Sequence, residues 1–267
     1  MANLKKIAVL CTLTSLTLLA LTACSGEKVT EEFLESYSVK QGTTVRINNP
    51  NGDVMVTGWD GDKVEIYAFK ESIHGKEALD EVDIFIEVAG EMIIRTEHPA
   101  SQAKVSVDYQ VKIPENVFLD IVEGSNGDIV IENLSGNLAL TTSNGSITAA
   151  GVYGTVSARS SNGDINISDV RGIGTLQTSN GSINAELSRL RDGVDIRTSN
   201  GSINLALAPT LEVDLSAKTS NGSVSYSGLN IEASEIDQTL LVGAMNGGGS
   251  KISITTSNGS IELVPLR

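Results

Sequence analysis

A short motif, Ser-Asn-Gly followed by Ser or Asp, recurs through the second half of this chain at nearly constant spacing. Successive motif asparagines are separated by 18, 18, 18, 20, 21 and 37 residues, and the last interval is close to two repeats. The repeated residues are Asn126, Gly127, Asn144, Gly145, Asn162, Gly163, Asn180, Gly181, Asn200, Gly201, Asn221, Gly222, Asn258 and Gly259. A fixed period of this length predicts an array of similar units stacked on one another.

Apolar and polar residues alternate on both sides of each motif. Around Asn162, for example, Val156 and Ala158 precede the motif, and Ile165 and Ile167 follow it, with polar residues between them. Alternation with a period of two is typical of a half-buried strand. Each unit is therefore predicted to contain two short strands joined at Asn-Gly, and an outlying copy at Asn51 follows the same template. The fold class is all-β.

Two all-β geometries fit this pattern. Asn-Gly is the strongest short signal for the two-residue turn of a β-hairpin, so a hairpin meander is one of them. In the other, a parallel β-solenoid, Asn-Gly forms a corner at which both residues tolerate a positive φ. Stacked coils must keep one path length, and identical asparagine and serine residues would then stack as hydrogen-bonded ladders. The constant period favours the solenoid.

The first residues are typical of an exported lipoprotein. Lys5 and Lys6 precede an apolar run over residues 7–21, which is the composition of a signal peptide. The sequence Leu-Thr-Ala-Cys at residues 21–24 resembles the bacterial lipobox, which implies cleavage after residue 23 and acylation of Cys24. By resemblance to the lipoproteins of diderm bacteria, a serine after the cysteine implies sorting to the outer membrane if the organism has one. Otherwise the anchor would lie in the outer face of the cytoplasmic membrane.

Composition divides the chain into four parts. Residues 1–23 are the predicted lipoprotein signal peptide, and residues 24–36 contain the acylated cysteine and a polar, acidic tether. Residues 37–117 read as a less regular β region, in which residues 72–81 are the one plausible short helix. Residues 118–267 read as the regular β-solenoid. Cys11 leaves with the signal, so the mature chain is expected to contain no disulfide.

The acidic composition narrows the classes of partner. The formal net charge is −14, which repels phosphate backbones, so nucleic acid is excluded as a partner. Cationic peptides or a basic protein surface would suit such a chain better. The acidic composition also has an explanation that involves no partner, because a high net charge keeps β-rich proteins soluble.

No catalytic, metal-binding or cofactor-binding constellation is evident. His74 and His98 stand apart from any second ligand or triad partner and are expected to be exposed. Asp128 and Asp164 follow two motifs that would be two coils, or about 9.6 Å, apart. That separation lies just outside the range for a pair of glycosidase carboxylates. The chain is expected to have no enzymatic activity and no cofactor.

The motifs together resemble those of the DUF4097 family of bacterial adhesin-like proteins. The resemblance rests on Thr-Ser-Asn-Gly-Ser-Ile, on Ile-Asn-Asn-Pro-Asn-Gly-Asp-Val-Met-Val-Thr-Gly-Trp at residues 47–59, and on Tyr-Gln-Val-Lys-Ile-Pro-Glu-Asn at residues 109–116. It extends from about Tyr37 to the C-terminus. It implies an all-β, solenoid-like fold and a similarity to domains of envelope-stress proteins that respond to antimicrobial peptides. It implies no catalytic residues.

Three functional hypotheses follow. The first is an acyl-anchored envelope lipoprotein that acts as an adhesin-like or scaffold protein through repetitive polar β faces. Its partners would be the membrane, through Cys24, and an envelope protein or a surface glycan. The alternative is a stress sensor or regulatory module that binds cationic peptides or a basic partner. The third, a polysaccharide-active enzyme on a β-helix, rests on analogy of fold alone.

Overall fold

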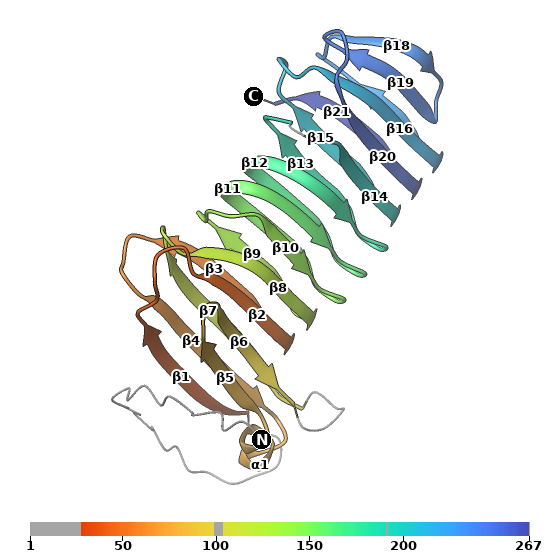
Figure 1. The fold of residues 1–267 in the computed structure, drawn as a ribbon. Coiled ribbons are helices and arrows are strands. Elements are labelled where there is room, and N and C mark those ends of the chain that lie inside the picture. Colours follow the sequence, from red (N-terminus) through yellow and green to blue (C-terminus); the bar gives the residue numbers. More distant parts are fainter. Residues whose placement is uncertain (1–27, 99–103, 191, 267) are drawn as a thin grey trace, which may run out of the picture.

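The computed structural model describes residues 28–98, 104–190 and 192–266. The predicted signal peptide and Cys24 lie outside these residues. Figure 1 shows an elongated stack of strands with the N-terminal strands at one end and a hairpin over residues 231–245 at the other. Apart from one short helix, the regular elements of the described chain are all β-strands, as the alternating pattern predicts.

Two faces form the long sides of the stack, and each coil contributes a strand to both. The first face, in spatial order, contains β5 (Asp83–Val88), β6 (Met92–Glu97), β2 (Thr44–Asn51), β8 (Phe118–Asn126), β10 (Leu138–Thr141), β11 (Ile147–Arg159), β12 (Ile165–Gln177), β14 (Val194–Asn200), β20 (Ser250–Asn258), β16 (Val213–Asn221), β19 (Leu240–Met245) and β18 (Ile231–Ile236). The second contains β1 (Val29–Tyr37), β4 (Val64–Ser72), β7 (Ser106–Pro114), β3 (Val54–Trp59), β9 (Ile129–Glu132), β11, β12, β13 (Ile183–Leu187), β15 (Ile203–Leu207), β21 (Ile261–Pro265) and β17 (Val224–Tyr226). β11 and β12 bend through both faces and join them.

The repeats pair in parallel, which confirms the solenoid and excludes the hairpin meander for them. Ile147 of β11 aligns with Ile165 of β12, and Ile165 aligns with Ile183 of β13, each one repeat further along the chain. A hairpin meander would instead pair consecutive strands of each unit in antiparallel fashion. The spacing of the motifs is therefore constant because each coil has the same path length.

The core lies between the two faces and is built from the inward half of each alternating strand. One column of fully buried side chains runs across the second face at the position three residues after six of the seven motif asparagines; the seventh residue, Val224, is partly buried. Its members are Ile129, Ile147, Ile165, Ile183, Ile203 and Ile261. Burying such a side chain contributes about 1.5–3 kcal/mol. With no disulfide among the described residues, burial and backbone hydrogen bonding hold the stack together.

Antiparallel strands close the N-terminal end. β1 pairs with β4, which pairs with β7, and β5 pairs with β6. The short helix α1 (Lys76–Asp80) lies within the predicted helical segment, at this end of the stack (Figure 1). The sequence predicts a tether over residues 24–36, but residues 29–36 belong to an edge strand. The three glutamates of this strand favour the prediction of a solvated segment. Charged residues on an edge strand also discourage aggregation.

The division expected at residue 118 does not correspond to a break in the fold. β2 pairs in parallel with β8, and β3 pairs in parallel with β9. Asn51 aligns with Asn126, so the outlying motif supplies the coil next to the first regular one. The two parts share one hydrogen-bonded network and one core.

The C-terminal coil lies between two coils that precede it in the chain. After β17 the chain forms the antiparallel hairpin β18–β19, and β19 pairs with β16. It then returns as β20, which pairs in parallel with β14 on one side and β16 on the other. β21 lies in the same way between β15 and β17. The long interval after Asn221 is therefore a hairpin excursion, and the spatial order of the last three motifs is Asn200, Asn258, Asn221.

Candidate functional site

The side-chain amides of the seven motif asparagines form one continuous ladder along the stack. In all of them except Asn126, Nδ2 donates to the Oδ1 of the asparagine in a neighbouring coil, at 2.8–2.9 Å. The spatial order is Asn126, Asn144, Asn162, Asn180, Asn200, Asn258 and Asn221. Asn51 does not extend the ladder in this way, because its Nδ2 donates to the carbonyl oxygen of Val105 at 2.7 Å.

The corners differ from the sequence-based expectation in one respect. All seven asparagines are described, and none has a positive φ. The glycine requirement is mainly steric, because Gly127, Gly145, Gly163, Gly181, Gly201, Gly259 and Gly222 stack directly on one another. A Cβ on any of them would lie closer than 3.0 Å to the carbonyl oxygen of the glycine in the adjacent coil.

A row of buried hydroxyl groups lies two residues before six of the seven asparagines, and Gly124 takes this position before Asn126. Thr178 Oγ1, for example, donates to the carbonyl oxygen of Gly163 at 2.9 Å, and Thr178 is almost completely buried. The same bond is made in neighbouring coils by Thr142, Ser160, Thr198, Thr256 and Thr219. These hydroxyls satisfy buried acceptors, which explains why threonine or serine directly precedes the Ser-Asn-Gly motif in these coils.

In every coil of the ladder except the one at its end, the residue after Asn-Gly accepts a backbone hydrogen bond from the adjacent coil. Asp128 Oδ1 accepts from the N–H of Ser146 at 2.7 Å, and Asp164 Oδ1 accepts from the N–H of Ser182 at 2.7 Å. Ser146 Oγ accepts from the N–H of Asp164 at 3.3 Å, so Asp128 and Asp164 stand two coils apart with Ser146 between them. Both carboxylates thus have a structural role at the corner.

The ladder gives a prediction about individual asparagines. Asn162→Ala and Asn258→Ala each remove two ladder bonds, whereas Asn221→Ala removes one. At about 0.5–1.5 kcal/mol per bond, the first two changes should lower the free energy of unfolding by about 1–3 kcal/mol and the third by about half as much. Chemical denaturation measures all three. Asn258 is the last motif in the sequence, so a small loss there together with a large loss at Asn221 would contradict the spatial order.

A second amide row lies on the outer surface of the second face. Asn184 Nδ2 donates to Asn166 Oδ1, and Asn204 Nδ2 donates to Asn184 Oδ1, both at 2.9 Å. The aligned outward residues form what we call the flat-face row: Thr148, Asn166, Asn184, Asn204, Glu262 and Ser225. These residues follow the motifs by four positions, which is the sequence signal for the row.

A second corner, not expected from the sequence, lies at the short edge of three coils. Asn133, Gly151 and Asp169 have φ angles of 55°, 66° and 47°, and they recur with the period of the repeat. Asn, Gly and Asp are the residues that tolerate this conformation best. The three residues are of different types, so the sequence indicates this corner only through their common spacing and their shared tolerance of a positive φ.

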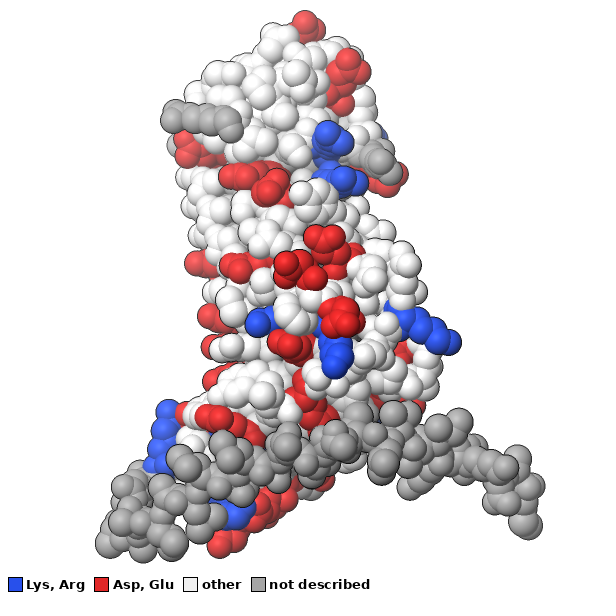
Figure 2. All heavy atoms as spheres, turned by 90° about the vertical axis from the view of Figure 1, so that its left-hand side faces the viewer, with Lys and Arg blue, Asp and Glu red and all other residues white. Residues whose placement is uncertain are grey.

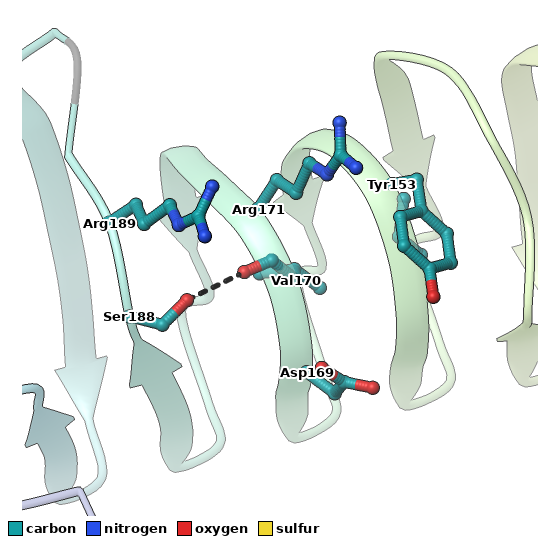
Figure 3. Close-up of a pocket in the computed structure, with 7 residues that line it drawn as sticks. Tyr153, Asp169, Val170, Arg171, Ser188 and Arg189 are labelled. Atoms are coloured by element: carbon teal, nitrogen blue, oxygen red, sulfur yellow. Dashed lines mark hydrogen bonds between the residues drawn. The ribbon is translucent and has the colours of Figure 1, made fainter.

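A shallow notch follows this corner (Figure 3). Its volume is about 230 Å³, and its lining residues are Val152, Tyr153, Asp169, Val170, Arg171, Ser188 and Arg189. Tyr153, Arg171 and Arg189 also recur with the period of the repeat, so three neighbouring coils supply them. The Arg171 guanidinium lies over the Tyr153 ring, 5.0 Å from its centroid. The hydroxyl of Ser188 donates to the carbonyl oxygen of Val170 at 3.3 Å.

The two histidines do not come together. His74 is exposed, whereas His98 is partly buried, contrary to expectation, and burial lowers the pKa of its imidazole. Within the described ranges, no group of three or more His, Cys, Asp or Glu residues is placed to hold a metal ion. The same residues contain no helix with the length and apolarity required to cross a bilayer.

Several solved structures are similar to this chain. One, described as a "putative cell adhesion protein" from Clostridium sporogenes, is 13% identical over 88% of this chain and 100% of its own, with a TM-score of 0.37. Another, a "putative adhesin" from Bacteroides fragilis, is 12% identical over 88% and 97%, with a TM-score of 0.33. A "putative lipid binding protein" from Parabacteroides distasonis is 12% identical over 86% and 96%, with a TM-score of 0.28. At these values the likenesses carry no argument about function.

Comparison of sequences identifies the family. No curated protein matches the chain. The family model described as Toastrack DUF4097 matches residues 116–264, which is more than half of the chain and includes all seven corners of the asparagine ladder. The repeated corners and the parallel stack therefore belong to a member of the Toastrack DUF4097 family.

Proposed function

We propose that this protein is a non-catalytic, adhesin-like component of the cell envelope that binds polar surface molecules through the flat-face row. The observation that carries the proposal is the row of outward amides at Asn166, Asn184 and Asn204, held in register by their own hydrogen bonds. An amide offers both donors and an acceptor, and the ladder bonds occupy only part of that capacity. Hydroxyl-rich surface glycans and polar protein surfaces match such a row.

The regular spacing makes weak contacts additive. Neighbouring coils repeat at about 4.8 Å, so a ligand with repeating polar groups can contact several amides at once. Once one contact has formed, it raises the effective concentration of the remaining ligand groups at the neighbouring amides. Individually weak contacts can therefore give a useful overall affinity. Asn184 and Asn204 are exposed, and Asn166 is half-buried, so the row is open to such a ligand.

We further propose that acyl chains on Cys24 anchor the protein, in the outer membrane of a diderm or otherwise in the outer face of the cytoplasmic membrane. β1 begins at Val29, so only four residues separate it from Cys24. Four residues span at most about 14 Å. Because β1 lies at the N-terminal end of the stack, the anchor would hold this end close to the headgroups. The C-terminal coils would then be the part furthest from the anchor.

One experiment tests both parts of the proposal. Bacteria that carry the full chain are compared for attachment to mucin-coated and cell-wall-coated surfaces. The double variant Asn184→Ala/Asn204→Ala should attach several-fold less, whereas Gln177→Ala, which removes an exposed amide from the first face, should attach normally. Cys24→Ser should move the protein from the membrane fraction to the soluble fraction. Attachment that stays unchanged when the whole chain is deleted contradicts the adhesin-like role.

The acidic surface favours a second candidate, the capture of cationic peptides by a sensor or regulatory module. Figure 2 shows acidic side chains recurring along one face, with fewer basic ones among them. At one corner, Asp53 and Asp128 lie just before β3 and β9, and Asp108 lies in the adjoining strand β7; each uses Oδ1 to accept a backbone N–H. Binding of a lysine-rich model peptide should weaken steeply with added salt. Salt-independent binding, or none, removes this candidate.

A further inference from the structure

The notch beside the second corner combines positive charge, an aromatic ring and a carboxylate on an otherwise acidic molecule. The ion pairs that arginines make in the described part of the chain involve Arg46, Arg95 and Arg197. Arg171 and Arg189 make none there, although both are exposed and line the same notch. Arg159, on the first face, is also exposed and makes none there, so Arg171 and Arg189 are distinguished by their placement together in one notch of a chain with a net charge of −14.

Alternation explains why these side chains point outward. After the second corner, Val152 and Val170 are buried, and the next residue in each coil, Tyr153 or Arg171, is therefore exposed. Val152 pairs with Val170, which fixes the first two coils in register. The hydrogen bond from Ser188 to Val170 places Arg189 in the following coil. A rigid stack thus holds the three side chains in a row.

The groups are arranged with opposite charges at opposite sides. In Figure 3 the guanidinium groups of Arg171 and Arg189 lie on one side of the notch, and the carboxylate of Asp169 lies on the other. The ring of Tyr153 flanks the row next to Arg171, and Tyr153 is 62% exposed. A matching ligand carries an anionic group at the arginine side and hydroxyl groups that can donate to Asp169.

We propose that this notch binds a carboxylated sugar, such as a uronic acid residue within an acidic polysaccharide. Guanidinium groups bind carboxylates through paired, charge-assisted hydrogen bonds. The ring hydroxyls of the sugar would donate to Asp169, and the exposed part of the Tyr153 ring would cover its apolar surface. Asp169 and the net negative charge of the chain disfavour a densely charged polyanion. This site is separate from the flat-face row, so either proposal can fail without the other.

The size of the notch agrees with a single sugar ring. Pockets for drug-sized ligands have volumes of about 300–1,000 Å³. The notch, at about 230 Å³, is smaller and is open on one side, where an extended chain could continue in both directions. One charged residue of a polysaccharide would therefore enter, and its neighbours would lie along the short edge of the stack.

Calorimetric titration of the purified full chain tests the proposal with a glucuronate-containing tetrasaccharide as the probe. We expect saturable binding that falls as salt is added. Arg171→Gln and Arg189→Gln should each weaken it by about ten-fold or more, which is the effect of losing one charge-assisted contact. Tyr153→Ala should also weaken binding. Arg159→Gln is the matched control, because Arg159 is an exposed arginine on the first face, outside the notch, and it should change the affinity less than two-fold.

Comparison probes decide among the remaining outcomes. The carboxyl-reduced, neutral tetrasaccharide should bind at least about ten-fold more weakly than the acidic one. Inorganic phosphate binding as tightly as the tetrasaccharide would mean that the notch holds anions without recognising a sugar, and the proposal would be overturned. Absence of saturable binding, or an equal loss in Arg159→Gln, would overturn it too. Chemical denaturation of each variant verifies that a lost affinity does not reflect a lost fold.

Discussion

Gly163→Ala is expected to lower the free energy of unfolding by about 3 kcal/mol or more. The added Cβ would lie closer than 3.0 Å to the carbonyl oxygen and carbon of Gly145 and to the backbone nitrogen of Ser146. All three are backbone atoms, so no side-chain rotation relieves the contact. The coils can separate only if the adjoining ladder bonds lengthen, because Asn162 and Asn144 fix the same spacing next to the glycines.

A second glycine separates this steric effect from the effect of backbone conformation. Gly90 has a φ of 89°, but a Cβ added there would meet no atom within 4 Å. Gly90→Ala should therefore lower the free energy of unfolding by only about 1–2 kcal/mol, the usual penalty for an L-residue in the left-handed region. Chemical denaturation of both variants makes the comparison. Equal losses at the two glycines would show that the corner can widen and that the stacked glycines are not in tight contact.

The constant period favours the parallel stack over a hairpin meander. A coil that lies directly on its neighbour must traverse the same path, so residues one period apart become neighbours and identical side chains meet. The asparagine ladder follows from this one condition. The conformation of the corner does not, because Asn-Gly fits a tight turn with positive φ as well as a close contact between backbones, and only the structure shows that the glycines touch.

The notch and the second corner could be found only partly from the sequence. Tyr153, Arg171 and Arg189 share the spacing of the repeat, yet they differ in chemistry and form no visible motif. Their exposure depends on the bend after Gly151 and Asp169, where residue types also differ from coil to coil. A repeat is recognised in a sequence by identical residues. The residues of the second corner share only a backbone conformation, and the residues of the notch share only an outward orientation of their side chains.

Residues 29–36 differ from the sequence-based prediction for another reason. β1 contains Glu31, Glu32 and Glu35, and this acidic composition favours a solvated tether. The strand forms because its backbone completes the edge of β4 and Phe33 packs against the core from one side. Pairing with a strand that is distant in the sequence leaves little local signal, and charged residues are typical of such an edge.

Removing residues 250–267 is expected to unfold more than the coil that is deleted. β20 and β21 bury Ile252, Ile254, Ile261 and Leu263 completely or almost so. At about 1.5–3 kcal/mol each, these side chains contribute on the order of 6–12 kcal/mol, which is comparable with the stability of a whole domain. Because the missing coil lies between β14 and β16, its loss also separates the two coils that it joins.

The sequence alone suggests the opposite result, and this makes the truncation informative. The interval between Asn200 and Asn221 is long enough for one coil and no longer. By sequence spacing alone, β16 could therefore stack directly on β14 in the shortened chain. In the full chain the connection over residues 208–212 instead passes the inserted coil. It is held there by Asn246, whose Nδ2 donates to the carbonyl oxygens of Pro209 and Leu211, both at 2.8 Å.

Hydrogen exchange distinguishes the two outcomes. We expect protection to be lost from β16 to β19 and retained from β2 to β12, and a synthetic 250–267 peptide should restore it. Native protection of β16 in the truncated chain would show that the coils close up without their neighbour, and that the inserted coil is dispensable for the end of the stack.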